Sequence, residues 1–238
     1  SEMNLQRFAW LTVAATFLLL LVGGTVNPTG SSLACPDWPT CYGSFFPEMK
    51  NGVEYEHTHR LVATLVGLLT VALALWIGAA RRSERRLVGL GWAAVGLVVA
   101  QGVLGGVTVL LRLPLLVSVA HLALSLGFLL WLIYLALRLA PSASSGPALP
   151  RGWMGAALGA VYLQALVGGL VRHTKAGRAC GQDWLRCSGT LWPDWGPAQL
   201  NMVHRALGVL TLLLLLVVAV VVAARARRAG RGAARLAA

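Results

Sequence analysis

Six long apolar segments dominate this chain and decide what kind of fold it can adopt. They cover residues 8–26, 59–80, 87–111, 115–137, 154–171 and 202–224. About 18 apolar residues in a helix are enough to cross the hydrocarbon layer of a membrane. Lipid offers the backbone no hydrogen-bond partner, so each segment must be helical. Of the 238 residues, 57% are hydrophobic and only 12% are charged, which excludes a soluble domain of this size. The sequence therefore predicts an all-α polytopic membrane bundle of six transmembrane helices.

The composition between these segments divides the chain into four parts. Residues 1–140 are expected to form a four-helix N-terminal half, and residues 141–152, rich in Ser, Pro and Ala, are the expected linker. Residues 153–224 hold two more helices, a partial second half, and residues 225–238 are a basic tail. We expect the tail to be disordered or to lie on the lipid surface. The first segment is too long for a signal-peptide core and no small-residue cleavage site follows it, so we expect it to remain in the mature protein.

The basic residues are distributed unevenly between the two sides of the predicted membrane. Positive residues mark the cytoplasmic face, so both termini are expected in the cytoplasm of a multi-pass cell-membrane protein. Loops 27–58, 112–114 and 172–201 are then outside. The net charge of +12 is therefore a topology signal; it argues for anionic membrane lipid as a partner and against nucleic acid. The cytoplasmic side carries Arg7, Arg81, Arg82, Arg85, Arg86, Arg138, Arg151, Arg225, Arg227, Arg228, Arg231 and Arg235, and the outer loops carry Lys50, Arg112, Arg172, Lys175, Arg178 and Arg186.

All four cysteines lie in the expected outer loops, as two close pairs. Cys35 and Cys41 are in the first loop, and Cys180 and Cys187 are in the third. Thiols outside a bacterial membrane are oxidised, so each pair is expected to form a disulfide. A zinc site is the alternative, but zinc-binding cysteines are usually only two to four residues apart and no second pair is nearby.

The first two segments and the last two share sequence motifs. Leu21-Val22-Gly23-Gly24 recurs as Leu166-Val167-Gly168-Gly169, and His59-Arg60 recurs as His204-Arg205. The cysteine pairs recur between these motifs in the same order. We therefore expect helices 1–2 and 5–6 to be one unit repeated, related by an axis along the membrane normal. Paired glycines, including Gly105-Gly106, are expected to let helix backbones approach closely.

Three histidines lie near the outer ends of different apolar segments. His59 begins the second segment and His121 lies at comparable depth in the fourth. A histidine at the edge of the hydrocarbon layer is costly without a partner, and imidazoles from facing helices are a common way to hold a haem iron. Arg60 follows His59 and is expected to bind a haem propionate. Glu56 can share a helix face with both and is the candidate catalytic residue. The alternatives are a hydrogen-bonded structural histidine and a carboxylate that complements the helix dipole.

The second half repeats the histidine but not the acid. His204 and Arg205 correspond to His59 and Arg60, while Asn201 stands at the position equivalent to Glu56. A carboxylate that only complemented a helix dipole would be equally useful in both halves. The contrast indicates that the first half carries out chemistry, whereas the second holds a metal ligand without a catalytic acid.

These residues, in this order and topology, resemble the haem A synthase family of membrane enzymes. The resemblance covers nearly the whole chain and rests on five motifs. They are Cys-Pro-Asp-Trp-Pro-Thr-Cys at 35–41, E-x-x-H-R at 56–60, Ala-His-Leu-Ala at 120–123, Gly-Gly-Leu-Val-Arg-His-Thr at 168–174 and His-Arg at 204–205.

The resemblance implies a function and a ligand set. It implies oxidation of the C8 methyl group of haem O to the formyl group of haem A, with Glu56 taking part and His59 and His121 bracketing the substrate. It also implies a role for the first cysteine pair in activity and a stable haem b in the second half, at His204. The family has eight helices and the chain ends after the sixth. The sequence could then be truncated before the second ligand of His204, this ligand could come from His173 or from another subunit, or the haem b could be absent.

Two functions remain open at this stage. The first is the haem A synthase-like oxidoreductase, with haem O as substrate and haem O synthase as an expected partner. The second is a b-type membrane cytochrome that relays electrons without catalysis. A transporter is less favoured, because the sequence shows no broken helix that would carry a substrate site.

Overall fold

The computed structural model describes residues 2–140, 151–183 and 185–236, and in this part of the chain six long helices account for nearly all regular structure. The helices are α1 (Glu2–Val26), α2 (Val53–Ala80), α3 (Arg85–Leu110), α4 (Leu115–Arg138), α5 (Arg151–His173) and α6 (Gly196–Leu236), with a short 3-10 helix η1 (Ala176–Arg178) after α5. All six are long and apolar enough to cross a membrane. The prediction of an all-α membrane bundle is confirmed.

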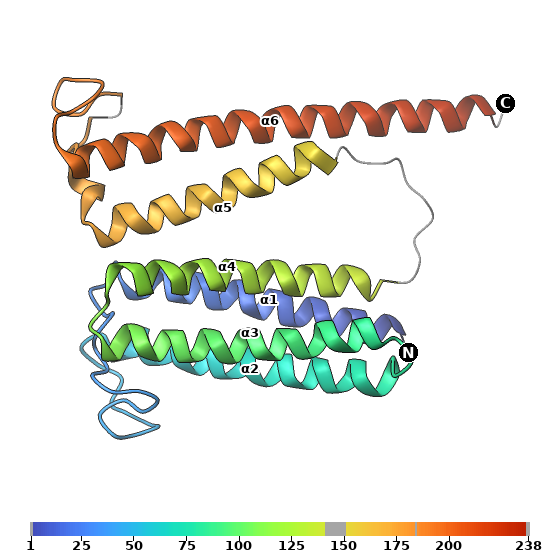
Figure 1. The fold of residues 1–238 in the computed structure, drawn as a ribbon, viewed down its shortest axis with the longest axis horizontal. Helices are drawn as coiled ribbons and strands as arrows, with labels where there is room; N and C mark the ends of the chain where they lie inside the picture. Colours follow the sequence, from blue (N-terminus) through green and yellow to red (C-terminus); the bar gives the residue numbers. More distant parts are fainter. Residues whose placement is uncertain (1, 141–150, 184, 237–238) are drawn as a thin grey trace. The chain divides into compact units, whose positions relative to one another are not determined.

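The chain divides into two compact units, Ser1–Ser142 and Ala143–Ala238. In the first unit, α1 contacts α2 and α4, and α3 contacts the same two helices, so the four helices form a closed bundle (Figure 1). In the second unit, α5 packs along α6, and η1 contacts both. The expected linker 141–152 falls mostly outside the described residues.

The helix ends differ from the sequence prediction in two places. Helix α2 begins at Val53 and α6 at Gly196, about a turn and a half before the predicted starts. The predicted starts were set by the apolar residues alone, but polar residues that lie outside the lipid can extend a helix at no cost in free energy. Helix α6 also extends to Leu236, so the tail is helical where disorder was one of the two expectations. Its many Ala and Arg residues are strong helix formers.

The apolar core of the first unit lies at one end of the bundle. It is built from the start of α1, the end of α2, the start of α3 and the end of α4. We call this end of the bundle the inner half. The buried core residues are Leu5, Ala9, Val13, Val66, Leu73, Ile77, Leu87, Ala94, Phe128, Leu132, Leu135, Ala136 and Leu139. The other end, the outer half, carries the first loop and the α3–α4 turn (Figure 1). All the candidate site residues of this unit lie in the outer half.

Each outer loop is closed by a disulfide, Cys35–Cys41 in the first unit and Cys180–Cys187 in the second, as the spacing predicts. A tight turn follows each pair, in which Cys41 bridges to Ser44 and Cys187 to Thr190. The two central residues of each turn have positive φ, as in the type I′ turns that favour glycine at the second position. Tyr42-Gly43 and Ser188-Gly189 occupy these positions.

Candidate functional site

His59 lies against a glycine of the neighbouring helix. A Cβ atom added to Gly23 of α1 would stand 2.7 Å from Cε1 of the His59 ring, so the ring would have to move if residue 23 carried a side chain. No hydrogen-bond partner for the buried Nδ1 atom of His59 occurs in the part of the chain that the structure describes. A buried ring nitrogen without a partner is costly in a folded protein and is free to bind a ligand.

His121 makes the same kind of contact from α4. A Cβ atom on Gly105 of α3 would lie 3.0 Å from Cε1 of its ring. Each stands about two helical turns before the first inner-half core residue of its helix, Val66 in α2 and Phe128 in α4. The two imidazoles thus lie at the same level of the bundle relative to its apolar core.

The residues of the outer half fit a haem. The site offers two imidazoles from facing helices and one unpartnered ring nitrogen, the donor set of bis-histidine ligation. A bound haem would supply the iron that these imidazoles ligate.

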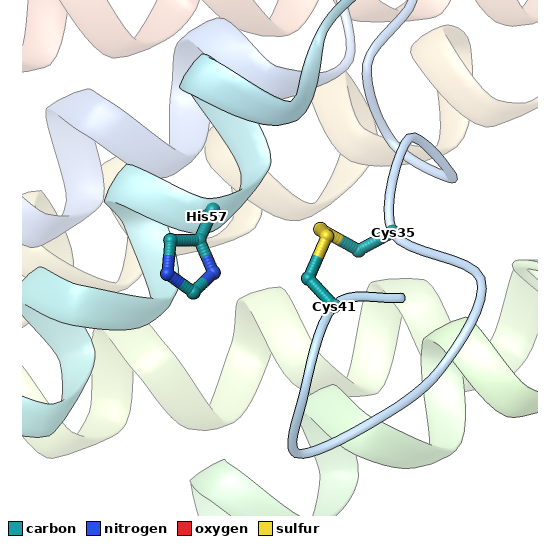
Figure 2. A group of neighbouring side chains, drawn as sticks. All are labelled: Cys35, Cys41 and His57. Carbon is teal, nitrogen blue, oxygen red and sulfur yellow. A yellow bond between two sulfur atoms is a disulfide. The ribbon is translucent and has the colours of Figure 1, made fainter. Parts of the chain in front are cut away.

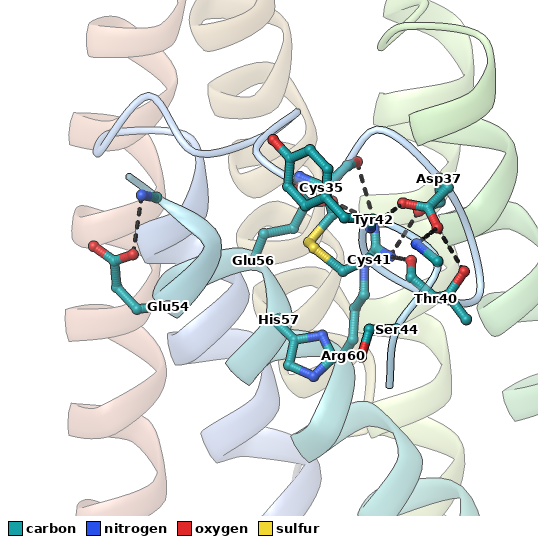
Figure 3. The surroundings of a disulfide bond; sticks show 12 residues. Cys35, Asp37, Thr40, Cys41, Tyr42, Ser44, Glu54, Glu56, His57 and Arg60 are labelled. Carbon is teal, nitrogen blue, oxygen red and sulfur yellow. Dashed lines mark hydrogen bonds and ion pairs between the residues drawn. A yellow bond between two sulfur atoms is a disulfide. The ribbon is translucent and has the colours of Figure 1, made fainter. Parts of the chain in front are cut away.

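Glu56 and Arg60 hold the first outer loop onto α2 (Figure 3). Glu56 is 4% exposed; its Oε2 accepts a hydrogen bond of 2.9 Å from the backbone N–H of Cys35, and its Oε1 accepts one of 2.6 Å from Arg60. The Arg60 guanidinium also donates to the carbonyls of Asp37 at 2.8 Å and Thr40 at 2.6 Å. Both side chains are therefore engaged with the loop. The expected propionate and catalytic roles of Arg60 and Glu56 stay predictions.

The first loop reaches α3 as well. The indole of Trp38 lies against Gly106, where an added Cβ atom would be 2.6 Å from its Cδ2 atom. Together with the Glu56–Arg60 pair, this contact ties the loop to two helices at the outer end of the bundle. The glycine pair 105–106 therefore leaves room for two side chains, His121 and Trp38.

Asp37 organises the turn that carries the disulfide. Its carboxylate accepts hydrogen bonds from the Thr40 hydroxyl at 2.5 Å and from the backbone N–H groups of Tyr42 at 2.6 Å and Gly43 at 2.9 Å. The Thr40 hydrogen bond, followed by those of Gly43 and Tyr42, lowers the pKa of Asp37 below its ordinary 3.8. The loop is thus shaped by an ionised side chain as well as by the disulfide.

His57 lies beside the first disulfide (Figure 2). A ligand atom from each of Cys35, Cys41 and His57 falls within 4.8 Å of the others. The two sulfurs are bonded to each other, however, so they are not available as the thiolate ligands that zinc needs. Nε2 of His57 also lies 3.1 Å from the carbonyl of Phe45. We therefore interpret His57 as a further contact between α2 and the first loop.

The second unit repeats these contacts around His204. A Cβ atom on Gly168 of α5 would lie 3.0 Å from Cε1 of His204, and no described residue provides a partner for its buried Nδ1 atom. Arg205 donates to the carbonyl of Asp183, as Arg60 does to that of Asp37. Asn201, 6% exposed, donates to the carbonyl of Ala176 at 2.7 Å. The amide of Asn201 thus contacts the loop of the second unit at the position where the first unit has the carboxylate of Glu56.

The sequence analysis did not identify two glutamines that contact the histidine segments. Nε2 of Gln101 lies 3.0 Å from Nδ1 of His121, and Nε2 of Gln164 donates to the carbonyl of His204 at 3.1 Å. Each glutamine stands one helical turn before a Gly-Gly pair in an otherwise apolar segment. That recurring pattern was visible in the sequence. His173, the alternative ligand, lies at the C-terminal end of α5, and its role stays a prediction.

The chain is similar to known proteins along most of its length. It matches the family model COX15-CtaA, described as a cytochrome oxidase assembly protein, over residues 6–57 and 48–238. A relative from Symbiobacterium thermophilum, named Heme A synthase, is 33% identical over 225 residues, which cover 88% of this chain and 73% of the relative. Proteins of the same name from Alkalihalophilus pseudofirmus and Halalkalibacterium halodurans are each 30% identical over 220 residues, with the same coverage.

Proposed function

We propose that this chain, which belongs to the COX15-CtaA family of cytochrome oxidase assembly proteins, is a membrane enzyme of haem A biosynthesis. Its relatives at about 30% identity carry the name Heme A synthase and align with 88% of the chain. The six apolar helices agree with an enzyme that handles a lipid-soluble haem. We place both termini in the cytoplasm of the cell, on the strength of the basic residues at that side.

The proposed reaction is oxidation of the C8 methyl group of haem O to a formyl group, through hydroxylated intermediates. Written with water as the oxygen source, it converts R–CH3 and H2O to R–CHO with release of four protons and four electrons, and an external electron acceptor takes the electrons. The observation that carries this proposal is the pair of histidines at matched depth, each lying against a glycine of a neighbouring helix. In this reading His59 and His121 bind the iron of the substrate and hold the macrocycle in the outer half. The first loop covers that end of the bundle through Trp38 and the Glu56–Arg60 pair.

Glu56 is the proposed catalytic residue of the first unit. Oxidation of a methyl group releases protons, and a carboxylate one helical turn from His59 is placed to accept them or to stabilise positive charge at the reacting carbon. Its two oxygens bind Arg60 and the N–H of Cys35, so it also holds the loop closed over the site. Arg60 and Arg205 are the proposed partners of haem propionates in the two units.

We further propose that the second unit binds a haem b through His204. The contact with Gly168 and the unpartnered Nδ1 atom, judged within the described residues, support this in the same way as for His59. The position equivalent to Glu56 is Asn201, which cannot accept a proton as a carboxylate does. The second unit is therefore proposed to hold a cofactor and the first to oxidise the substrate. A haem O synthase is the expected partner that supplies the substrate.

The test is the haem content of cells that make haem O but lack their own haem A synthase. The full chain should convert extracted haem O to haem A or its hydroxylated precursor. His59→Ala and His121→Ala should leave haem O unconverted. Extraction of haem b alone from wild-type protein, with haem O unchanged in the cells, would refute the enzyme and leave the electron-relaying cytochrome.

A further inference from the structure

Each outer loop exposes two apolar residues directly after its disulfide turn. In the first loop they are Phe45, 64% exposed, and Phe46, 91% exposed. In the second they are Leu191, 70% exposed, and Trp192, 59% exposed. We call these residues the two tip pairs. Single apolar residues scattered over a surface are normal, but here an exposed pair occupies the same place in two loops, which calls for a physical reason.

The two loops also share the residues around each tip pair. The first reads Gly-Ser-Phe-Phe-Pro-Glu at 43–48, and the second reads Gly-Thr-Leu-Trp-Pro-Asp at 189–194. In both, a tight turn precedes the pair, and a proline and an acid follow it. The loops thus present apolar and charged side chains in the same order.

A contact with α2 fixes the depth of the first tip pair. Nε2 of His57 lies 3.1 Å from the backbone carbonyl of Phe45. His57 stands two residues before position 59, where the apolar segment of α2 begins. At a rise of about 1.5 Å per residue, the contact is about 3 Å outside that segment. The headgroup region on each side of a bilayer is about 5–7 Å thick, so the backbone of Phe45 lies at the level of the lipid headgroups.

A different contact gives the second tip pair the same depth. Nε2 of Gln199 on α6 donates at 3.0 Å to the carbonyl of Pro193, which directly follows Trp192. Gln199 stands three residues before position 202, where the apolar segment of α6 begins. The contact is therefore about 4.5 Å outside that segment, again within the headgroup region.

Both contacts lie in line with exposed apolar residues of the helix that each loop touches. Residues four apart share a helix face, so His57 is followed on its face by Leu61 and Leu65, which are both exposed. Gln199 is followed in the same way by Val203, which is also exposed. Figure 1 shows the first loop extending sideways past α2 and the second past α6. The tip pairs thus continue the apolar surface of these spans to the headgroup level.

The charges beside the tip pairs suit a boundary between lipid and water. The first charged residue after each pair is an acid, Glu48 or Asp194. The Glu48 carboxylate lies 2.6 Å from the ammonium group of Lys50, and both side chains are mostly exposed to solvent. Charged side chains are costly in hydrocarbon, whereas aromatic and leucine side chains favour the membrane interface. Each loop therefore has one part suited to lipid and, two residues on, one part suited to water.

We propose that the two tip pairs insert into the membrane leaflet nearest the loops and hold both outer loops at the lipid surface. The partner is the bilayer itself, with the side chains of each pair among the upper acyl chains. In the first unit this fastens a loop that Trp38 and the Glu56–Arg60 pair already tie to the bundle. The loop is then held on one side by protein and on the other by lipid.

The experiment measures where each tip lies in the full chain in lipid nanodiscs. A nitroxide label is attached to a single cysteine introduced by Phe46→Cys or Trp192→Cys, without reductant, so that both disulfides stay closed. The matched controls are Glu48→Cys and Asp194→Cys, two residues on in each loop. Electron paramagnetic resonance then gives the collision rates of each label with oxygen, which concentrates in lipid, and with a water-soluble nickel chelate.

The labels at 46 and 192 should have an oxygen-to-nickel collision ratio several-fold higher than the labels at 48 and 194. Nickel collisions as frequent at 46 and 192 as at the controls would place the tips in water and overturn the proposal. Infrequent collisions with both reagents would show that protein covers the tips, and would overturn it too. The replaced side chains are exposed, and Phe45 and Leu191 remain in each tip, so folding is preserved. No outcome depends on haem, so the proposed function is tested separately.

Discussion

Replacement of Gly23 by alanine tests the haem site most directly, because the contact it creates is known. The new Cβ atom would stand 2.7 Å from Cε1 and 3.1 Å from Nδ1 of His59. Carbon atoms in ordinary contact are about 3.5–4.0 Å apart. The ring must therefore move by about 1 Å, and ligand geometry tolerates displacements of only about 0.5 Å.

The expected cost to folding is small and the cost to function large. Overpacking lowers the free energy of unfolding by about 1–3 kcal/mol, and alanine, as the better helix former, raises it by up to about 1 kcal/mol. A displacement of about 1 Å at a reacting centre can lower activity on the order of 100-fold. We therefore expect Gly23→Ala to fold, to lose the low-spin spectrum of bound haem O and to form little haem A.

The matched control is the next residue. A Cβ atom on Gly24 would meet nothing within 4 Å, so Gly24→Ala should keep both the spectrum and the activity. Both variants are assayed by absorption of haem O-loaded protein and by haem A yield in cells without their own synthase. A Gly23→Ala protein with wild-type spectrum and yield would refute the argument that His59 binds the iron from its present position.

Three further predictions concern the first loop and are read out by the rate of Cys35–Cys41 reduction with a phosphine. Glu56→Gln replaces one carboxylate oxygen by an NH2 group and so removes one charge-assisted hydrogen bond, worth about 1.5–3 kcal/mol. Reduction should then be roughly 10- to 100-fold faster and haem A formation should be lost. Glu54→Gln is the control, because Glu54 accepts only from the Gly52 N–H and an amide oxygen can still accept there; full activity in Glu56→Gln would assign Glu56 a structural role. Gly106→Ala would place a Cβ atom 2.6 Å from the Trp38 ring and should also speed reduction, whereas Gly102→Ala, with nothing within 4 Å, should not. The pKa of Asp37 is lowered in the folded protein. Its carboxylate therefore contributes its full stabilisation of the turn above the unfolded pKa, and this stabilisation is lost as the pH falls through the folded pKa, which lies below 3.8. Reduction of the disulfide should accelerate over that range in the wild type and much less in Asp37→Asn.

The sequence was sufficient for the features that depend on local pattern. Apolar length predicts all six helices, because hydrocarbon thickness fixes how many residues a span needs. Spacing and side of the membrane predict the pairing of Cys35 with Cys41 and of Cys180 with Cys187. The equal depth of two histidines follows from their positions in spans of similar length.

The partners of individual side chains could not be predicted in this way. Gly105 and Gly106 are typical of a helix-packing motif. The space beside a glycine can, however, be filled by a neighbouring backbone or by a side chain from a helix or a loop. Here the side chains of His121 and Trp38 fill it. The sequence predicts Arg60 as a propionate ligand, but its hydrogen bonds to loop carbonyls distant in the sequence could not be predicted. Gln101 is recognisable in the sequence only by comparison with Gln164, since each stands one helical turn before a Gly-Gly pair.

The one-sided core of the first unit has a consequence for how this bundle opens. Backbone amides around Val66, Leu73 and Leu132 belong to the packed inner half and should exchange with solvent deuterium only when the whole unit unfolds. Amides around His59 and His121 lie beyond that core and should exchange through smaller, local openings. Helices packed firmly at one end can then separate at the other while the inner half stays folded. A flat molecule could pass between them sideways, directly from the lipid, without crossing water.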